Sequence, residues 1–238
     1  MSDNKIKILV VDDSDVILHA LRNFFKDYQF DVITCHDGLE GVQKASEELP
    51  SLIILDLMMP NLDGVKMLRV IKVIEKVKEI PVIVISGNTN KRNVIAAIEA
   101  GAETVLSKPL KKDVLKKAIT EILGNEFFVK AKEKKIREEN EKEFQKELRQ
   151  FFLNSFHIKR ELIEKSLSTK DLRGLRHVFH EIKGSGSTIG YKILTKIGSE
   201  VEEMIDEEFD DWKYYHGKCD EVFDIVKQME QEEQNTEL

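Results

Sequence analysis

Short apolar runs alternate with longer amphipathic segments along the first half of this chain. The runs are Ile6–Val11, Asp31–Cys35, Leu52–Leu57, Val82–Ser86 and Thr104–Ser107. The segments with helical spacing are Asp15–Tyr28, Leu39–Glu48, Gly64–Lys76, Arg92–Ala100 and Asp113–Leu123. Strands that alternate with helices indicate parallel βαβ units, and strands that are apolar throughout are buried on both faces. The pattern predicts a doubly wound α/β domain with a five-stranded parallel sheet over residues 1–124.

The second half of the chain has no strand pattern. Its apolar positions recur at helical spacing, first at Leu148, Phe151, Phe152, Phe156, Leu162, Ile163 and Leu167. A start signal at Thr169–Asp171 precedes a second helix, and Tyr191–Ile205 and Trp212–Met229 make two more. This pattern predicts an all-α, four-helix bundle over residues 146–232. We expect the glutamate-rich end, Glu230–Leu238, to be frayed.

A densely charged segment joins the two halves, and we interpret residues 125–145 as a helical connector or first bundle helix. Within Lys130–Lys146 only Ala131, Ile136 and Phe144 are apolar. A coiled-coil zipper is the alternative, but it needs apolar positions sustained over several heptads.

Composition narrows the possible partners. The formal net charge of −7 argues against non-specific nucleic-acid binding, which needs a basic surface. No apolar run approaches the roughly 20 residues of a membrane span, and the first residues do not form a signal-peptide core. Cys35 and Cys219 lie far apart and are expected to be reduced thiols, with a disulfide as the alternative. We therefore expect a cytoplasmic protein without membrane insertion, either a monomer or a weak dimer.

Polar residues stand at the carboxyl ends of four predicted strands. Asp12 and Asp13 follow the first strand, Asp56 ends the third, and Ser86 and Lys108 close the fourth and fifth. Ligands of open parallel sheets bind beyond these strand ends. Converging carboxylates repel one another, and a hard cation such as Mg²⁺ resolves that repulsion while also holding phosphate oxygens. One acidic residue at a strand end is ordinary loop chemistry, but this combination predicts a phosphoryl-handling site.

A single helix in the second half carries a histidine away from its core stripe. The stripe is Leu172, Leu175, Phe179, Ile182 and Gly186; the face around His180 holds Arg173, Arg176, Lys183, Gly184 and Ser187. We expect this face to be cationic and solvated. Lys183 would neutralise phosphate on His180, Gly184 would leave room for it, and Gly186 would permit close helix packing. The alternative is that His180 is an ordinary solvated histidine whose basic neighbours have no functional role.

His177 is the nearest rival to His180, on the edge of the same face. The two histidines are spaced i, i+3 and could ligate a metal, but the sequence offers no convincing third ligand.

Residues 1–124 resemble a response-regulator receiver domain of the flavodoxin-like fold. The motifs are Val-Asp-Asp at 11–13, Asp56 within Leu-Asp-Leu-Met-Met-Pro, Ser86 before Gly87, and Lys108-Pro109. The resemblance implies that Asp56 accepts a phosphoryl group in a Mg²⁺-dependent step. It also implies that Asp12, Asp13, Asp56 and the carbonyl of Met58 serve the metal, that Ser86 and Lys108 contact the phosphoryl group, and that the Lys108–Pro109 bond is cis.

One position departs from the receiver pattern. Receivers usually carry an aromatic residue three positions before the lysine, and its ring moves inward on phosphorylation. Here that position is Val105. The departure puts in doubt any output that depends on a moving ring, although phosphoryl transfer itself needs none.

Residues 126–232 resemble a histidine phosphotransfer (HPt) domain. The motif is Val-Phe-His-Glu-Ile-Lys-Gly-Ser followed by Ile189-Gly190. The resemblance implies a four-helix bundle with His180 as an exposed phosphoryl carrier and no kinase activity of its own. Nothing in the sequence resembles the glycine-rich boxes of a kinase catalytic domain, so we expect a non-enzymatic phosphotransfer protein.

The sequence thus predicts a phosphorelay protein that exchanges phosphoryl groups between Asp56 and His180, a sensor histidine kinase, and other receiver domains or HPt proteins. Two alternatives stay open: a phosphorylation-switched binding module whose helical domain is never phosphorylated, and a phosphate sink. A DNA-binding output is a distant third, because no basic reading helix is evident.

Overall fold

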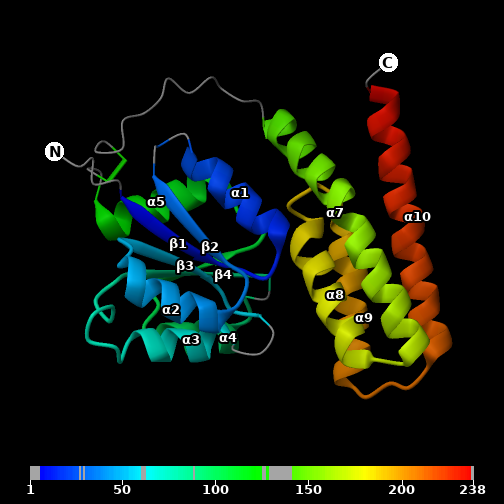
Figure 1. Ribbon diagram of the computed structural model, residues 1–238, viewed down its shortest axis with the longest axis horizontal. Helices are drawn as coiled ribbons and strands as arrows, with labels where there is room; N and C mark the ends of the chain where they lie inside the picture. Colours follow the sequence, from blue (N-terminus) through cyan, green and yellow to red (C-terminus); the bar gives the residue numbers. More distant parts are fainter. Residues whose placement is uncertain are drawn as a thin grey trace. The chain divides into compact units, whose positions relative to one another are not determined.

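The computed structural model describes residues 6–26, 28, 30–59, 63–87, 89–124, 127–128 and 141–236 (Figure 1). The chain divides into two compact units, Met1–Glu138 and Glu139–Leu238. Each unit has its own elements and its own core. Among the described residues, no helix is both long and apolar enough to span a membrane.

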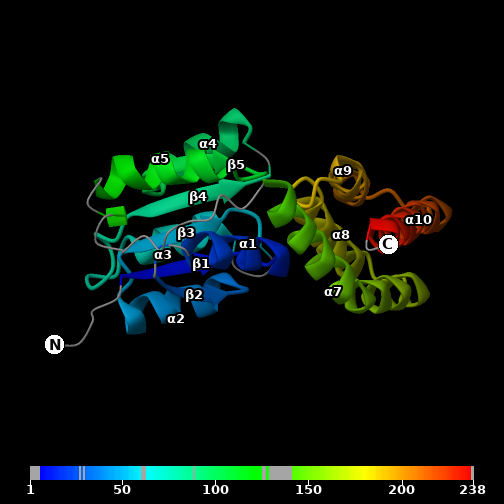
Figure 2. The ribbon, with the colours of Figure 1, turned by 90° about the horizontal axis from the view of Figure 1, so that it is seen from above.

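The first unit contains a five-stranded parallel sheet. Its strands are β1 (Lys7–Val11), β2 (Asp31–Cys35), β3 (Leu52–Asp56), β4 (Val82–Ser86) and β5 (Thr104–Ser107). The spatial order is β2-β1-β3-β4-β5, which can be followed from strand to strand in the view from above (Figure 2). In this order β1 pairs with β3, and Val11 lies opposite Leu55. All the residues of β3 and β4 are buried, as their apolar sequences predict.

Helices cover both faces of the sheet, which confirms the doubly wound prediction (Figure 1). They are α1 (Asp15–Lys26), α2 (Gly38–Glu48), α3 (Gly64–Ile71), α4 (Lys91–Glu99) and α5 (Lys112–Leu123). Side chains of α1 and α5 pack on one face of the sheet, and those of α2, α3 and α4 pack on the other. α3 is shorter than predicted, because the chain turns after Lys72 while Val77 still reaches the core.

A cluster of aromatic rings closes the core beyond α5. Phe127 stacks on Phe30 with ring centroids 4.7 Å apart, and Phe128 meets Tyr28 edge-on at 4.8 Å. Both phenylalanines are buried in the same core as α1 and α5. The packed core of the first unit therefore includes residues beyond position 124, where the strand and helix pattern ends.

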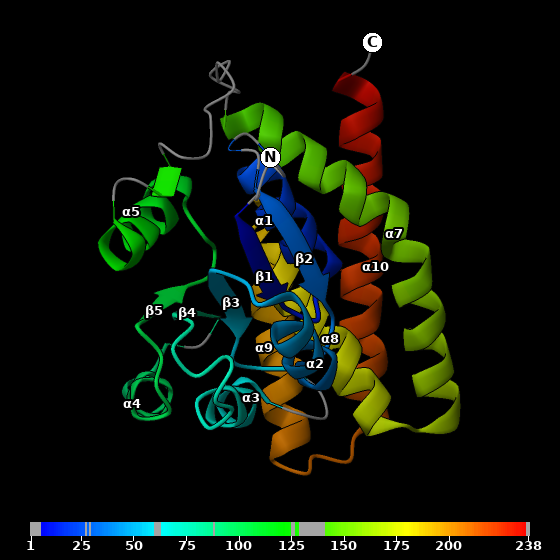
Figure 3. The same cartoon turned by 60° about the vertical axis from the view of Figure 1, so that its left-hand side comes forward.

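The second unit is a bundle of four helices: α7 (Glu141–Thr169), α8 (Leu172–Gly186), α9 (Lys192–Asp206) and α10 (Trp212–Thr236). α7 and α10 run side by side (Figure 3), and α8 packs between α7 and α9. Asp171 caps α8 by accepting hydrogen bonds from the backbone N–H groups of Arg173 and Gly174. This agrees with the start signal in the sequence.

Two predictions concern the ends of this unit. The connector and zipper interpretations fall mainly on residues outside the described ranges, which resume at Glu141, where α7 begins. At the other end, α10 continues to Thr236. The prediction of a frayed segment from Glu230 is therefore wrong for most of its length.

The two cysteines are buried free thiols, Cys35 in the first unit and Cys219 in the second. Burial raises the pKa of each thiol to about 12. Neither thiol is paired in the structure, which agrees with the expectation of reduced thiols.

Candidate functional site

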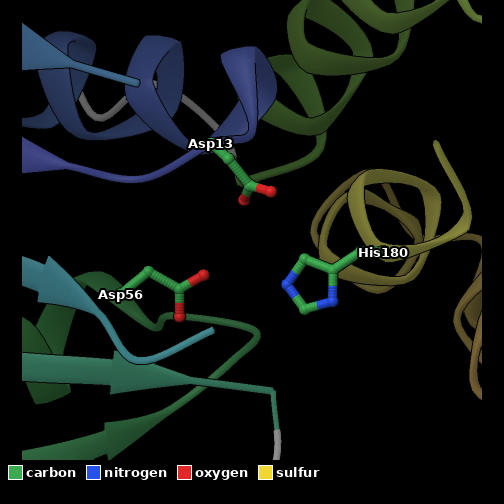
Figure 4. Close-up of side chains that lie close together, drawn as sticks. All are labelled: Asp13, Asp56 and His180. Carbon is green, nitrogen blue, oxygen red and sulfur yellow. The ribbon is translucent and has the colours of Figure 1, made fainter. Parts of the chain in front are cut away.

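The first candidate site lies at the carboxyl edge of the sheet. Asp12 and Asp13 directly follow β1, and Asp56 is the last residue of β3. Because β1 and β3 are paired neighbours, their ends meet at one edge. Figure 4 shows the side chains of Asp13 and Asp56 projecting from these adjacent strand ends. The convergence that the sequence predicted is therefore present.

Lys108 links two of these carboxylates. Its Nζ lies 2.7 Å from Oδ2 of Asp12 and 3.0 Å from Oδ2 of Asp56. Its side chain is only 6% exposed, and the Lys108–Pro109 peptide bond is cis, as predicted. Burial works to lower the pKa of this lysine, but the two carboxylates outweigh it and the pKa is raised. Lys108 therefore remains a fixed positive charge at the base of the site.

The pKa of Asp12 is strongly affected by this arrangement. Burial raises the pKa of its carboxyl to about 6, against the lowering effect of Lys108 and with a further rise from Asp56. Its Oδ1 also accepts a hydrogen bond from the backbone N–H of Ser14 at 2.9 Å. Among the described residues, Oδ1 of Asp56 is buried without a hydrogen-bond partner. Buried carboxylate oxygens of this kind fit a hard, oxygen-seeking cation such as Mg²⁺.

Ser86 and Met58 complete the predicted residues of this site. Ser86 ends β4 and is fully buried, and its carbonyl accepts a hydrogen bond from the backbone N–H of Lys108 at 2.8 Å. Met58 follows Asp56 by two residues. Both lie at the expected edge, but the roles of the Ser86 hydroxyl and of the Met58 carbonyl stay predictions.

Val105 occupies the position where receivers usually carry an aromatic ring. It lies on β5 opposite Val84 and packs against the apolar core under α2, α3 and α4. Its side chain is thus part of the packing of the sheet.

The second candidate site lies on α8, where His180 projects from the helix (Figure 4). Its Nδ1 is 2.5 Å from Oε1 of Glu202, a residue of α9. Lys183, one turn along α8, donates to the other carboxylate oxygen of Glu202 at 2.6 Å. Glu202 is 5% exposed, so one buried carboxylate holds both the histidine and the lysine.

The carboxylate of Glu202 is kept ionised by these two partners. Burial alone would raise its pKa, but hydrogen bonds and charge from His180 and Lys183 outweigh burial and lower the pKa to about 2. Sequence reasoning missed this residue. The sequence feature that could have identified Glu202 is its position next to Val201, at the edge of the apolar stripe of α9.

Acidic residues of α9 pair with the basic residues of the face that was expected to be cationic and solvated around His180. Lys183 pairs with Glu202, and Arg176 makes two hydrogen bonds to Asp206, at 2.9 and 3.3 Å. A helical wheel of α8 alone contains no information about the acidic residues of α9. Gly184 lies one turn after His180, and its role in making room stays a prediction.

His177 belongs to a different network. Its Nε2 lies 3.2 Å from Oε1 of Glu181, and the other oxygen of Glu181 pairs with the buried Lys159 of α7. Each of the two histidines therefore contacts its own carboxylate. This arrangement favours His180 over His177 as the residue that Lys183 assists.

Two family models match the chain, a response regulator receiver domain over residues 8–120 and an Hpt domain over residues 147–235. The transcriptional regulatory protein PrrA of Mycobacterium tuberculosis is 36% identical over 103 residues, 43% of each protein. The alkaline phosphatase synthesis transcriptional regulatory protein PhoP of Bacillus subtilis is 34% identical over 103 residues, which cover 43% of this chain and 42% of PhoP. The match thus spans less than half the length of these curated relatives.

Solved structures resemble the first half of the chain. The chemotaxis protein CheY4 of Vibrio cholerae is 26% identical, with 50% of this chain and 98% of CheY4 covered and a TM-score of 0.48. The matching chain of a CheX–CheY–BeF3–Mg²⁺ complex from Borrelia burgdorferi is 30% identical, with 50% and 89% covered and a TM-score of 0.47.

Proposed function

We propose that this chain, which carries a response regulator receiver domain followed by an Hpt domain, is a phosphorelay protein whose phosphoryl acceptors are Asp56 and His180. The observation that carries the proposal is the presence of two organised side-chain clusters, one around each acceptor residue. Lys108 bridges Asp12 and Asp56 in the receiver domain, and Glu202 holds His180 and Lys183 in the Hpt domain.

In the receiver domain, Asp56 is the nucleophile. A carboxylate oxygen attacks the phosphorus of a partner's phosphohistidine, a P–O bond forms, and the P–N bond breaks. The departing imidazole keeps the electron pair of that bond. Lys108 stays beside the acceptor and offsets the negative charge that accumulates there.

Mg²⁺ is the metal that we assign to this edge, held by Asp12, Asp13, Asp56 and the carbonyl of Met58. When bound, it neutralises carboxylate and phosphoryl charge. The Ser86 hydroxyl, at the end of β4, would donate to a phosphoryl oxygen.

In the Hpt domain, Glu202 determines which nitrogen of His180 reacts. An ionised carboxylate can only accept a hydrogen bond, so Nδ1 of His180 is the donor and carries the proton. The imidazole lone pair is then on Nε2. Nε2 attacks the phosphorus of an aspartyl phosphate, a P–N bond forms, and the carboxylate leaves with the electron pair of the broken P–O bond. Lys183 supplies positive charge one helical turn away.

The partners follow from these two half-reactions. The phosphohistidine donor is a sensor histidine kinase or another HPt protein, and the aspartyl phosphate belongs to a receiver domain. Both half-reactions pass on an existing phosphoryl group, so neither needs a kinase active site.

A labelled-phosphate transfer assay tests the proposal. Wild type, Asp56→Asn and His180→Gln are incubated with a phosphorylated kinase and then with downstream receivers. We expect Asp56→Asn to lose receiver labelling and His180→Gln to lose transfer onward.

Two matched controls accompany these variants. Asp113→Asn removes an exposed acid on α5, and His177→Gln removes the other histidine of α8. Both should transfer as wild type does. If His180→Gln still passes label onward, the relay is refuted and the switched binding module is favoured. Label that stays on Asp56 would instead indicate a phosphate sink.

A further inference from the structure

α8 and α9 approach each other so closely that two glycines are needed at their contact. A Cβ atom on Gly186 would lie 2.6 Å from the backbone nitrogen of Thr195 and 2.9 Å from Cβ of Leu194. A Cβ atom on Gly198 would lie 2.7 Å from Cβ of Lys183 and 2.8 Å from the carbonyl oxygen of Phe179. Carbon atoms in ordinary contact are about 3.5–4.0 Å apart, so neither site accommodates a side chain without movement.

The contact at Gly198 is at the level of the acceptor histidine. Phe179 and Lys183 bracket His180 along α8, and both meet the same glycine of α9. Glu202 follows Gly198 by one helical turn, so both residues lie on the same face of α9. The backbone of α9 therefore lies close against α8 immediately beside the carboxylate that holds His180.

Close approach determines whether this carboxylate reaches its partners. Glu202 contacts His180 at 2.5 Å and Lys183 at 2.6 Å, and both are near the short limit for hydrogen bonds. An alanine at position 198 would have to move α9 away from α8, because one of the atoms it meets is a backbone oxygen. A shift of several tenths of an ångström at this level lengthens both hydrogen bonds.

We propose that Gly198 is a positioning residue for His180: by admitting α9 against Phe179 and Lys183, it brings Glu202 within hydrogen-bonding distance of Nδ1 and thereby fixes the reactive tautomer. The kinetic part of this inference rests on the proposed function, whereas the part on the tautomer does not.

Nitrogen NMR of the full chain with ¹⁵N-labelled histidine tests the proposal. The protein has six histidines, and His180→Gln identifies the signals of the acceptor. In wild type we expect the Nδ1–H form of neutral His180. In Gly198→Ala we expect the signals to move toward those of mixed tautomers. The rate at which a phosphorylated receiver labels His180 should fall about ten-fold, as for a lost charge-assisted hydrogen bond.

Three further variants separate positioning from general loosening. Gly217→Ala adds the same methyl group to α10, where it would meet nothing within 4 Å, and should match wild type. Gly186→Ala introduces an equally close contact in the same helix pair, but away from His180. Glu202→Asp withdraws the carboxylate by one methylene and leaves position 198 unchanged. It should reproduce the tautomer change, even if Gly198→Ala does not fold.

The outcomes are distinct. A wild-type tautomer in folded Gly198→Ala, or in Glu202→Asp, overturns the proposal. So does an equal change in Gly186→Ala, because the effect would then be loosening of the helix pair. A wild-type chain that shows the Nδ1–H form but never accepts label at His180 refutes the relay and leaves the positioning role intact.

Discussion

At the scale of single residues, the two acceptor sites use opposite electrostatic arrangements. In the receiver domain, burial holds the pKa of Asp12 near 6, so its carboxylate is costly to ionise without a cation. In the Hpt domain, the partners His180 and Lys183 outweigh burial and lower the pKa of Glu202 to about 2, so its carboxylate is ionised at neutral pH. The first site is prepared for a metal and the second for a fixed hydrogen bond.

The raised pKa of Asp12 predicts a pH-dependent metal affinity. Mg²⁺ competes with the proton on Asp12, so its affinity should increase as the pH rises through 6. Between pH 5 and 7 we expect about a ten-fold gain, because the ionised fraction changes by that factor. Calorimetric titration of Mg²⁺ at both pH values measures it. Asp12→Asn should bind weakly at both, and a wild-type affinity that is equal at pH 5 and 7 would contradict the assignment.

The residues differ in how far the sequence revealed them. Asp12, Asp56 and Lys108 were predictable because each stands at a strand end, and parallel pairing of β1 with β3 brings such ends together. Glu202 was not predictable in the same way. It lies on a different helix from His180, and the contact depends on how closely α8 and α9 pack. The periodicity of a single helix shows which face a residue lies on, but it does not identify the helix that packs against that face.

At the scale of elements, boundaries set by the local sequence matched the prediction, whereas boundaries that depend on packing did not. The strands ended within one residue of the predicted runs, because turns and charged residues follow these runs. α3 ended early at Ile71, although the predicted helical segment, Gly64–Lys76, also included Val73 and Ile74. Consecutive turns place Ile74 and Val77 against the core, whereas Val73 is 75% exposed. Apolar spacing alone does not distinguish these two ways of burying a side chain.

The aromatic cluster beyond α5 supports a prediction about stability. Phe127 is 7% exposed and stacks on Phe30. Phe127→Ala should lower the free energy of unfolding of the receiver unit by about 3 kcal/mol, the usual cost of deleting a buried ring. Urea denaturation followed by far-UV circular dichroism measures it. As control, Val73→Ala truncates a 75% exposed side chain and should change stability by less than about 0.5 kcal/mol. Equal effects would mean that the cluster contributes little to folding.

At the scale of the whole molecule, the chain combines two separately cored units. The only tryptophan, Trp212, begins α10, so its fluorescence reports on the Hpt unit alone. Mg²⁺ at ten times its dissociation constant should stabilise the receiver unit by about 1.4 kcal/mol. We expect the receiver transition seen by circular dichroism to move with Mg²⁺, while the Trp212 transition stays in place. Asp13→Asn should abolish the shift, and a Trp212 transition that follows the metal would show that both units unfold together.

The buried cysteines make this molecule convenient for site-specific labelling. Alkylating reagents react with thiolates, and the pKa of about 12 leaves Cys35 and Cys219 almost entirely protonated at neutral pH. A cysteine introduced at an exposed position, such as Lys91 in the receiver unit or Lys213 in the Hpt unit, would take up nearly all of a maleimide dye. A pair of such dyes would report the distance between the two units during phosphoryl transfer, without removing either native thiol.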